Sequence, residues 1–188
     1  MDILETLKNY NIVKTGHFKL TSGKHSMYYV NKDSIWLNHE CASAVLHSLV
    51  LKADDISSAH PFDFITGPAV AGAMFAVVVS VMFSVPFVYP EKDSQGNMVF
   101  RRGFDKFIKG KRGLIIEDII TTGGSLKKTA DGLAACGAEA TAGIVIWNRT
   151  GEKPIPYVYS LVDEPITSYD PSDCPLCKNG TPLTDPKA

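Results

Sequence analysis

The stretch LIIEDIITTGGS, residues 114–125, decides the fold of this chain and raises the question of what it binds. Two acids, Glu117 and Asp118, interrupt an aliphatic run, although an unpaired charge buried in a strand is costly to desolvate. A turn rich in hydroxyl groups and glycine follows them directly. We therefore expect the acids at the end of a buried strand, where they can face a crevice rather than the core.

The turn at residues 121–125 has the chemistry of an anion site. Consecutive backbone N–H groups, together with the positive end of the helix that follows, form a cradle for phosphate. Gly123 and Gly124 allow the backbone to approach a ligand closely. Thr121, Thr122 and Ser125 add hydroxyl groups, and the neighbouring acids can accept hydrogen bonds from sugar hydroxyls. A phosphorylated sugar suits both halves, and the alternative is a capped helix preceded by a solvated acidic pair.

Strand patterns alternate with helical patterns on both sides of this stretch. Strands are expected over residues 62–67, 86–90, 113–118, 141–148 and 155–161, and helices over 36–52, 70–83 and 125–136. This alternation predicts an α/β fold with a mostly parallel central sheet flanked by helices. Ligands of such sheets bind beyond the carboxyl ends of the strands. We expect one domain over residues 1–188, with a small N-terminal hood (about 1–40), a core (about 41–165) and a loose tail (about 178–188).

Composition narrows the class of protein. The chain has 188 residues and a formal net charge of −1, so no nucleic acid or membrane partner is expected. Residues 69–88 carry no charge and could span a bilayer, but Gly72 and Pro86 interrupt them, which favours a buried helix followed by a strand. The amino terminus does not resemble a secretory signal, so a cytoplasmic location is expected.

The cysteines provide one short motif, CPLC, formed by Cys174 and Cys177. A zinc site usually needs two such pairs, or histidines at ligand spacing. The five histidines lie between His17 and His60 without such spacing. A reduced surface turn is therefore expected, with zinc binding, a redox role or pooling of the pairs between two subunits as alternatives.

Other phosphate-binding motifs are incomplete. GPAVAG, residues 67–72, has the glycine spacing of a Walker loop, but Ala73 occupies the position of the essential lysine. The chain has no G-x-G-x-x-G sequence for a dinucleotide. A nucleoside triphosphatase and a dehydrogenase are both disfavoured.

LIIEDIITTGGS resembles the phosphoribosyl pyrophosphate (PRPP) signature of type I phosphoribosyltransferases. Three further stretches resemble orotate phosphoribosyltransferases: HFKLTSGKHSMYYVNKD (17–33), ITGPAVAGAMFA (65–76) and IVIWNR (144–149). The resemblance covers most of the chain from Gly16 to Arg149. It implies the type I phosphoribosyltransferase fold and the reaction of orotate with PRPP in pyrimidine biosynthesis, which yields orotidine 5′-monophosphate and pyrophosphate.

The resemblance also implies a role for each matched segment. Glu117 and Asp118 would hold the ribose 2′- and 3′-hydroxyls, and residues 121–125 the 5′-phosphate. The backbone of Gly67, Pro68 and Ala69 would meet the pyrophosphate. Mg²⁺ is the implied cofactor, with no protein ligand expected, because this ion keeps most of its waters and takes phosphate oxygens from the substrate.

Orotate would be held chiefly by Arg149, whose planar fork suits a carboxylate. The other implied contacts to orotate are Thr121, Lys24 and Tyr29, with Tyr28 as an alternative for stacking on the base. A surface arginine and ordinary hood packing are the alternatives for these residues.

Residues 90–112 are expected to form a mobile lid. Displacement at the ribose passes through a cationic state while pyrophosphate leaves, so catalysis requires positioning and charge neutralisation rather than a nucleophile. Lys92, Arg101 and Arg102 are the catalytic cations expected to reach pyrophosphate, in the same subunit or in the neighbouring subunit of a homodimer. The alternative is a solvated basic hairpin.

Some positions depart from the orotate enzymes. Thr21 and Ala71 stand where lysines are often found, and the lid sequence EKDSQGNMVFRRGF is unusual. Two alternatives therefore stay open: a phosphoribosyltransferase for a purine or another pyrimidine, and a non-catalytic regulator that senses PRPP. The regulator would need a nucleic-acid-binding element, and none is apparent ahead of Thr15.

Overall fold

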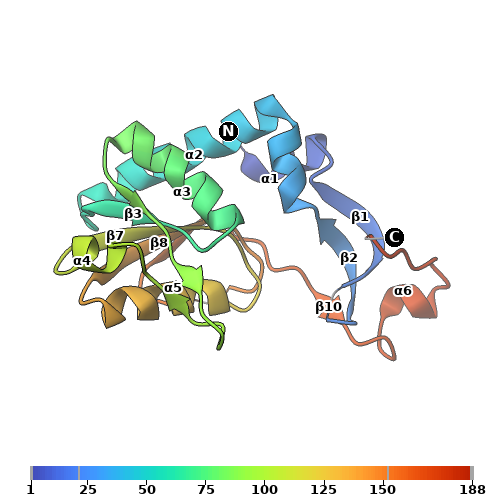
Figure 1. Ribbon diagram of the computed structural model, residues 1–188. Helices are drawn as coiled ribbons and strands as arrows, with labels where there is room; N and C mark the ends of the chain where they lie inside the picture. The colour runs from blue at the N-terminus through green and yellow to red at the C-terminus, as the bar shows by residue number, and fades with distance from the viewer. Residues whose placement is uncertain (1, 21, 152, 187–188) are drawn as a thin grey trace. The chain divides into compact units, whose positions relative to one another are not determined.

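A computed structural model describes residues 2–20, 22–151 and 153–186 of the chain (Figure 1). The chain divides into two compact units. The smaller unit combines the residues up to Ala42 with those from Pro165 onward, and the larger unit runs from Ser43 to Glu164. Each unit is described by itself below.

The larger unit is built on a five-stranded parallel sheet, which confirms the predicted α/β class. Its strands, in spatial order, are β4 (Phe87–Val88), β3 (Phe64–Thr66), β7 (Arg112–Ile120), β8 (Glu139–Asn148) and β9 (Val158–Val162). The helices are α2 (His39–Ser57), most of which lies in this unit, α3 (Ala71–Phe83), α4 (Phe104–Ile108) and α5 (Gly124–Ala135). A hairpin of β5 (Glu91–Lys92) and β6 (Met98–Val99) precedes α4.

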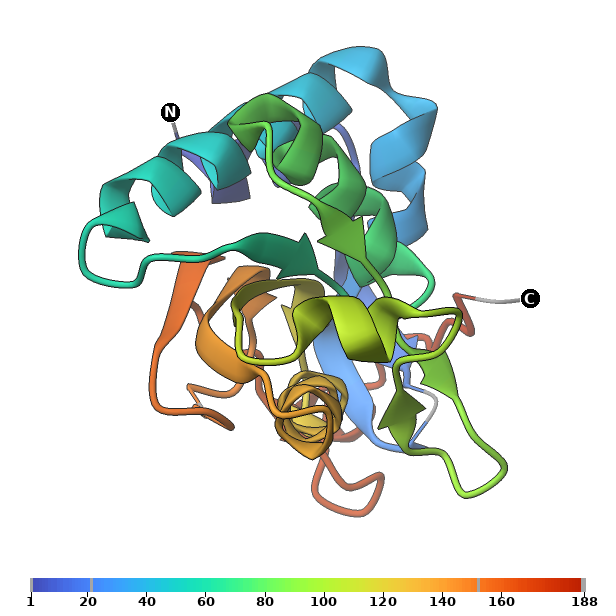
Figure 2. The same ribbon diagram turned by 60° about the vertical axis from the view of Figure 1, so that its left-hand side comes forward.

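Helices cover both faces of the sheet, which explains why β7 and β8 are buried along nearly their whole length. Figure 2 looks nearly along α5 and places α2 and α3 on the opposite side of the sheet. Leu126 and Leu133 of α5 join a buried cluster with Ile115 of β7 and Val145 of β8. This packing holds α5 against the sheet, and the backbone ladder sets the register of β3, β7 and β8.

The uncharged stretch over residues 69–88 forms the 13-residue helix α3 followed by β4, as the sequence predicts. Within the described part of the chain, no helix combines the length and apolar character needed to cross a bilayer.

The smaller unit contains α1 (Ile3–Asn9), β1 (Val13–Lys19), β2 (His25–Val30), the 3₁₀ helix η1 (Lys32–Leu37), β10 (Ser168–Tyr169) and α6 (Pro175–Lys178). The three strands form an antiparallel sheet in the order β1-β2-β10. The helix predicted over residues 36–52 instead begins at His39. Asn38 sets this start, because its side-chain oxygen accepts the N–H of Cys41 at 2.8 Å.

The C-terminal segment belongs to this smaller unit, although the sequence suggests a loose tail from about residue 178. The N–H of Thr184 donates to the His17 carbonyl at 2.8 Å, and the N–H of Lys19 donates to the Thr184 carbonyl at 3.0 Å. The prediction of a surface turn at the CPLC motif is wrong for Cys174, which is fully buried, whereas Cys177 is exposed. These contacts join residues far apart in the sequence, so local composition cannot indicate them.

Candidate functional site

The functional site of the larger unit lies where β3, β7 and β8 end. Ile120 pairs with Asn148 across β7 and β8, so the residues that follow, Thr121 and Arg149, leave the sheet side by side. The N–H of Arg149 donates to the Ile120 carbonyl at 3.1 Å, which extends this register beyond the strand. The parallel register therefore brings together two segments whose sequence motifs point separately to PRPP and to orotate.

The two acids lie within β7, just before its last two residues, and both are buried: Glu117 is 6% exposed and Asp118 is 3% exposed. Glu117 Oε1 accepts the N–H of Asp118 at 3.0 Å, and Asp118 Oδ1 accepts the N–H of Ile119 at 2.5 Å. A carboxylate can accept several hydrogen bonds at once, so these local contacts leave the acids suited to receive ligand hydroxyls. The strand predicted to end at Asp118 thus continues to Ile120; of the two acids Glu117 lines the pocket described next, whereas Asp118 is not among its lining residues.

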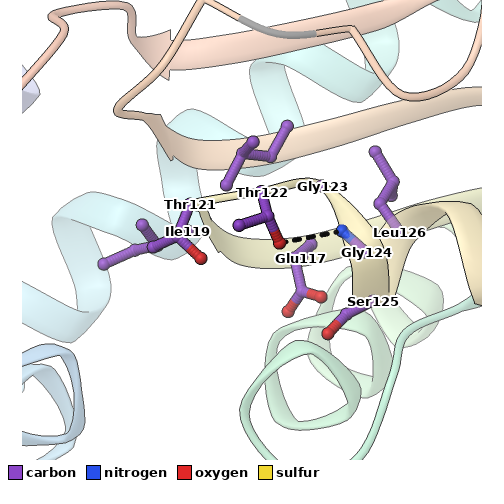
Figure 3. Close-up of a pocket in the computed structure, with 9 residues that line it drawn as sticks. Glu117, Ile119, Thr121, Thr122, Gly123, Gly124, Ser125 and Leu126 are labelled. Carbon is purple, nitrogen blue, oxygen red and sulfur yellow. Dashed lines mark hydrogen bonds between the residues drawn. The ribbon is translucent and has the colours of Figure 1, made fainter. Parts of the chain in front are cut away.

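A pocket that is open to solvent lies over the start of α5. It is lined by Glu117, Ile119, Ile120, Thr121, Thr122, Gly123, Gly124, Ser125 and Leu126 (Figure 3). Gly123 precedes the helix with φ of 72°, a conformation that favours glycine.

The start of α5 is suited to an anion. No side chain among the described residues caps this helix, and the first N–H groups of a helix have no acceptor within it. The Thr122 hydroxyl accepts the N–H of Gly124 only at a long 3.5 Å, shown as a dashed line in Figure 3. The helix dipole adds positive potential at the same place, so the pocket combines donors for a phosphate with the Glu117 carboxylate.

The loop between β3 and α3 packs tightly against β7 beside the acids. A Cβ on Gly67 would lie 2.5 Å from the Gly72 carbonyl carbon and 2.6 Å from the Ile116 oxygen. A Cβ on Gly72 would lie 3.0 Å from Glu117 Oε1. Only glycine fits at both positions, and the loop backbone thereby reaches the acidic strand end. Gly67 and Pro68 are buried there, whereas Ala69 is exposed.

Arg149 is a half-buried cation at the end of β8. Its Nε atom is buried and has no hydrogen-bond partner among the described residues. Desolvation by burial lowers the pKa of the Arg149 guanidinium from its ordinary value. A buried cationic donor without a partner is costly, so an anionic ligand would stabilise this side chain.

Two polar residues at the strand ends were not among those predicted from the sequence. Asn148 is buried, and its Oδ1 accepts the N–H groups of Thr150 at 3.2 Å and Gly151 at 3.1 Å, which shapes the turn that carries Arg149. An asparagine directly after an aliphatic strand is a usable signal for such a turn. Thr66 ends β3, and its buried hydroxyl has no partner among the described residues. It directly precedes Gly67, so it can donate to a ligand held by that loop.

The predicted lid contains the β5–β6 hairpin, and in this structure it packs on α5. Met98 and Phe100 are buried, and Lys128 Nζ donates to the Gly96 carbonyl at 2.8 Å. Gly132 permits this packing, because a Cβ there would collide with the Met98 carbonyl oxygen.

The three cations assigned to the lid, Lys92, Arg101 and Arg102, are exposed. Arg102 Nε donates to Glu91 Oε1 at 2.6 Å, so this guanidinium is already paired within the hairpin. Contact of the three cations with pyrophosphate stays a prediction.

The hood residues assigned to orotate lie in the smaller unit. Lys24 is exposed, with its Nζ 3.8 Å from Asp170 Oδ1. Tyr29 is half-buried, with its ring centroid 5.8 Å from that of Phe18. Their contact with the base also stays a prediction.

Known proteins share both the sequence and the fold of this chain. Residues 52–173 match the family model of the phosphoribosyl transferase domain. Orotate phosphoribosyltransferase from Thermotoga maritima is 35% identical over 190 residues, which cover 98% of this chain and 96% of the relative. Orotate phosphoribosyltransferase from Caldanaerobacter subterraneus subsp. tengcongensis is 32% identical over 187 residues, which cover 98% of this chain and 95% of the relative.

A solved structure, orotate phosphoribosyltransferase from Aeropyrum pernix, superposes with a TM-score of 0.65 at 23% identity. The match covers 85% of this chain and 93% of that chain, and it shows a common fold. Together with the near full-length matches in sequence, these findings lead to one conclusion: the chain belongs to the phosphoribosyltransferase family, among its orotate phosphoribosyltransferases.

Proposed function

We propose that this protein transfers the phosphoribosyl group of PRPP to orotate, giving orotidine 5′-monophosphate and pyrophosphate in pyrimidine biosynthesis. The state of the Arg149 side chain is the observation that supports orotate as the base. Its buried Nε lacks a hydrogen-bond partner among the described residues. Arg149 also leaves the sheet beside the turn at residues 121–125, which is called the PRPP turn below. Orotate offers a carboxylate that satisfies a planar guanidinium, whereas neutral purine bases do not.

In this proposal the segments at the carboxyl ends of β3, β7 and β8 each bind a different part of PRPP or orotate. The turn after β7 binds the 5′-phosphate through its N–H groups, and Glu117 and Asp118 accept the ribose hydroxyls. The two acids also place negative charge near the ribose, which stabilises the cationic state that forms as pyrophosphate leaves. The Gly67–Gly72 loop meets the pyrophosphate with its backbone. Arg149 orients the base so that its ring nitrogen faces the anomeric carbon.

Mg²⁺ fits this site as a companion of the substrate rather than as an ion held by the protein. Among the described residues, no group of three or more carboxylates is placed to hold it. Such an ion takes phosphate oxygens and retains waters, so PRPP would carry it, with the ribose hydroxyls bound at Glu117 and Asp118. When bound, Mg²⁺ neutralises charge on the leaving pyrophosphate.

A panel of bases tests the reaction directly. The protein is incubated with PRPP and Mg²⁺ together with orotate, uracil, adenine, hypoxanthine or xanthine, and pyrophosphate release is measured. Orotate is expected to be favoured by about a hundredfold or more in kcat/KM, because other bases leave the buried guanidinium unpaired. Preference for a purine would overturn the assignment of Arg149. Tight PRPP binding without turnover of any base would indicate a PRPP-sensing regulator.

We also place the protein in a homodimer, and α3 supports this. Val70, Met74, Val77 and Val81 recur at helical spacing on and just before this helix, and all are exposed, at 73%, 39%, 39% and 71%. The helix carries no charged residue, and an exposed apolar stripe of this kind is typical of an interface. A cytoplasmic location is part of the same proposal, and the four cysteines support it because none of them is in a disulfide.

The Val81→Asp variant is expected to shift the protein from dimer to monomer, because it places a charge on the apolar stripe. Sedimentation velocity measures the change, with a weakening of association of about tenfold or more expected. Lys109→Asp, at an exposed position after α4, is the matched control and should leave the dimer intact. A monomeric wild-type protein, or an unchanged sedimentation coefficient for Val81→Asp, would contradict the proposed interface.

A further inference from the structure

Four potential metal ligands converge in the smaller unit, outside the site described above. His17 lies on β1, His25 opens β2, Cys174 immediately precedes α6, and Cys177 lies within α6. Their ligand atoms all lie within 4.8 Å of one another. His17, His25 and Cys174 are 2%, 5% and 0% exposed, so the group is largely shielded from water.

The separations match those of ligands around a tetrahedral zinc ion. His17 Nε2 lies 3.1 Å from His25 Nδ1, 3.5 Å from Cys174 Sγ and 3.7 Å from Cys177 Sγ. Cys177 Sγ lies 3.2 Å from His25 Nδ1. Zn–N bonds of about 2.0 Å and Zn–S bonds of about 2.3 Å place tetrahedral ligands about 3.3 Å apart for two nitrogens and about 3.5 Å apart for nitrogen and sulfur.

We infer that His17, His25, Cys174 and Cys177 bind a structural Zn²⁺ ion. Binding releases the two thiol protons to solvent, and the two thiolates then balance the charge of the ion. The resulting site is neutral overall, which suits its burial. Four protein ligands complete a tetrahedral shell, so no position is left for substrate and the role is structural rather than catalytic.

The surroundings of His17 prepare it to bind a metal. Its Nδ1 lies 2.8 Å from the Thr181 carbonyl oxygen, which can only accept a hydrogen bond. The proton of the neutral ring is therefore on Nδ1, and the Nε2 lone pair faces the other three ligand atoms. A backbone carbonyl that fixes the tautomer in this way is characteristic of metal-bound histidine.

Two other uses of the same residues fit less well. In a two-iron cluster with this ligand set, the cysteines bind one iron and the histidines the other, which would separate the two pairs. Here His25 Nδ1 lies only 3.2 Å from Cys177 Sγ, so the atoms surround a single point. A redox-active disulfide would involve only the two cysteines, so it would not account for the burial of His17 or for the orientation of its ring.

The ion would join the two chain segments that make up the smaller unit. His17 and Cys174 are 157 residues apart, and the β1–β2 hairpin between His17 and His25 carries Lys24. A cross-link between segments so distant in sequence removes much conformational freedom from the unfolded chain. A unit this small also has a limited core, a situation in which a structural metal is a common source of stability.

Metal analysis of the full-length protein tests the site. Protein produced with added zinc and purified under reducing conditions should retain about one zinc per chain by inductively coupled plasma mass spectrometry. The Cys174→Ser/Cys177→Ser and His17→Asn variants should retain almost none. His47→Gln and Cys136→Ser alter a histidine and a cysteine outside the cluster, and they should retain the zinc of the wild-type protein.

A second measurement keeps the test valid if the ligand variants fail to fold. Wild-type protein stripped of zinc and reloaded with Co²⁺ should show the visible absorption of tetrahedral cobalt with thiolate ligands. Removing the metal should lower Tm by about 5 °C or more, and zinc should restore it. The inference is overturned if zinc-loaded wild-type protein contains no metal, if the ligand variants retain wild-type zinc, or if Cys174 and Cys177 are found in a disulfide.

Discussion

The E117Q/D118N variant is expected to lose about a thousandfold in kcat/KM for PRPP, the largest effect foreseen for this protein. Both changes keep the size of the side chain and replace a carboxylate by an amide. A hydrogen bond to a charged group contributes about 1.5–3 kcal/mol, so losing two charge-assisted bonds to ribose hydroxyls amounts to about 4 kcal/mol. The buried position of both acids strengthens these bonds, because few water molecules compete for the carboxylates.

The two acids differ in position, so their single variants separate two contributions. Glu117 lines the pocket at the start of α5, and its Oε1 would lie 3.0 Å from a Cβ on Gly72, whereas Asp118 is not among the residues that line this pocket. Each single variant should lose between about tenfold and a hundredfold, and the two losses need not add because both acids hold one ribose. Steady-state kinetics and calorimetric PRPP binding distinguish an effect on affinity from an effect on turnover.

A carboxylate outside the site provides the matched control. Asp131 lies on the exposed side of α5, where its Oδ2 pairs with Lys127 Nζ at 2.8 Å. Asp131→Asn removes an exposed ion pair, which contributes little to stability, and it should leave PRPP kinetics unchanged. If E117Q/D118N remains folded and keeps wild-type PRPP affinity and turnover, the two acids have only a structural role. The proposal that they bind the ribose hydroxyls then fails.

Arg149→Ala is expected to lower kcat/KM for orotate by about a hundredfold, with KM for PRPP nearly unchanged. The substitution removes a desolvated, bidentate partner for a carboxylate, a loss of about 3 kcal/mol. Arg149→Lys keeps the charge but not the planar fork, so it should recover only part of the activity. Initial rates at varied orotate and saturating PRPP measure the effect.

Thermal unfolding without ligand separates a binding role from a structural one. Because Arg149 Nε has no partner among the described residues, replacing this side chain should leave the Tm of the free protein unchanged or raise it. Orotate, which binds the folded protein, should then stabilise the wild type but not Arg149→Ala. Lys153→Ala, an exposed cation in the same loop, is the matched control. If Arg149→Ala keeps the orotate kinetics of the wild type, residues other than Arg149 select the base.

The sequence alone determined the architecture of the larger unit and the location of its site. The aliphatic runs of β7 and β8 are long, and the helix after Gly123 has a clear apolar face, so local periodicity sufficed to predict a parallel sheet. Only Ile119 and Ile120 separate the acids from the Gly-rich turn, so the covalent chain itself holds acids and turn close together near the end of β7. The site that the acids and the turn form together could therefore be predicted from the local sequence.

The tertiary structure decided whatever depends on residues that are distant along the chain. Only the register of Ile120 with Asn148 places Arg149 beside the PRPP turn, and only the fold leaves its Nε buried and unpaired among the described residues. The CPLC pair alone supplies only two ligands, and the histidines of the smaller unit have no recognisable ligand spacing, because two strands and a C-terminal segment supply the four residues separately. Such a site is defined by three-dimensional distances, which no local pattern of residues encodes.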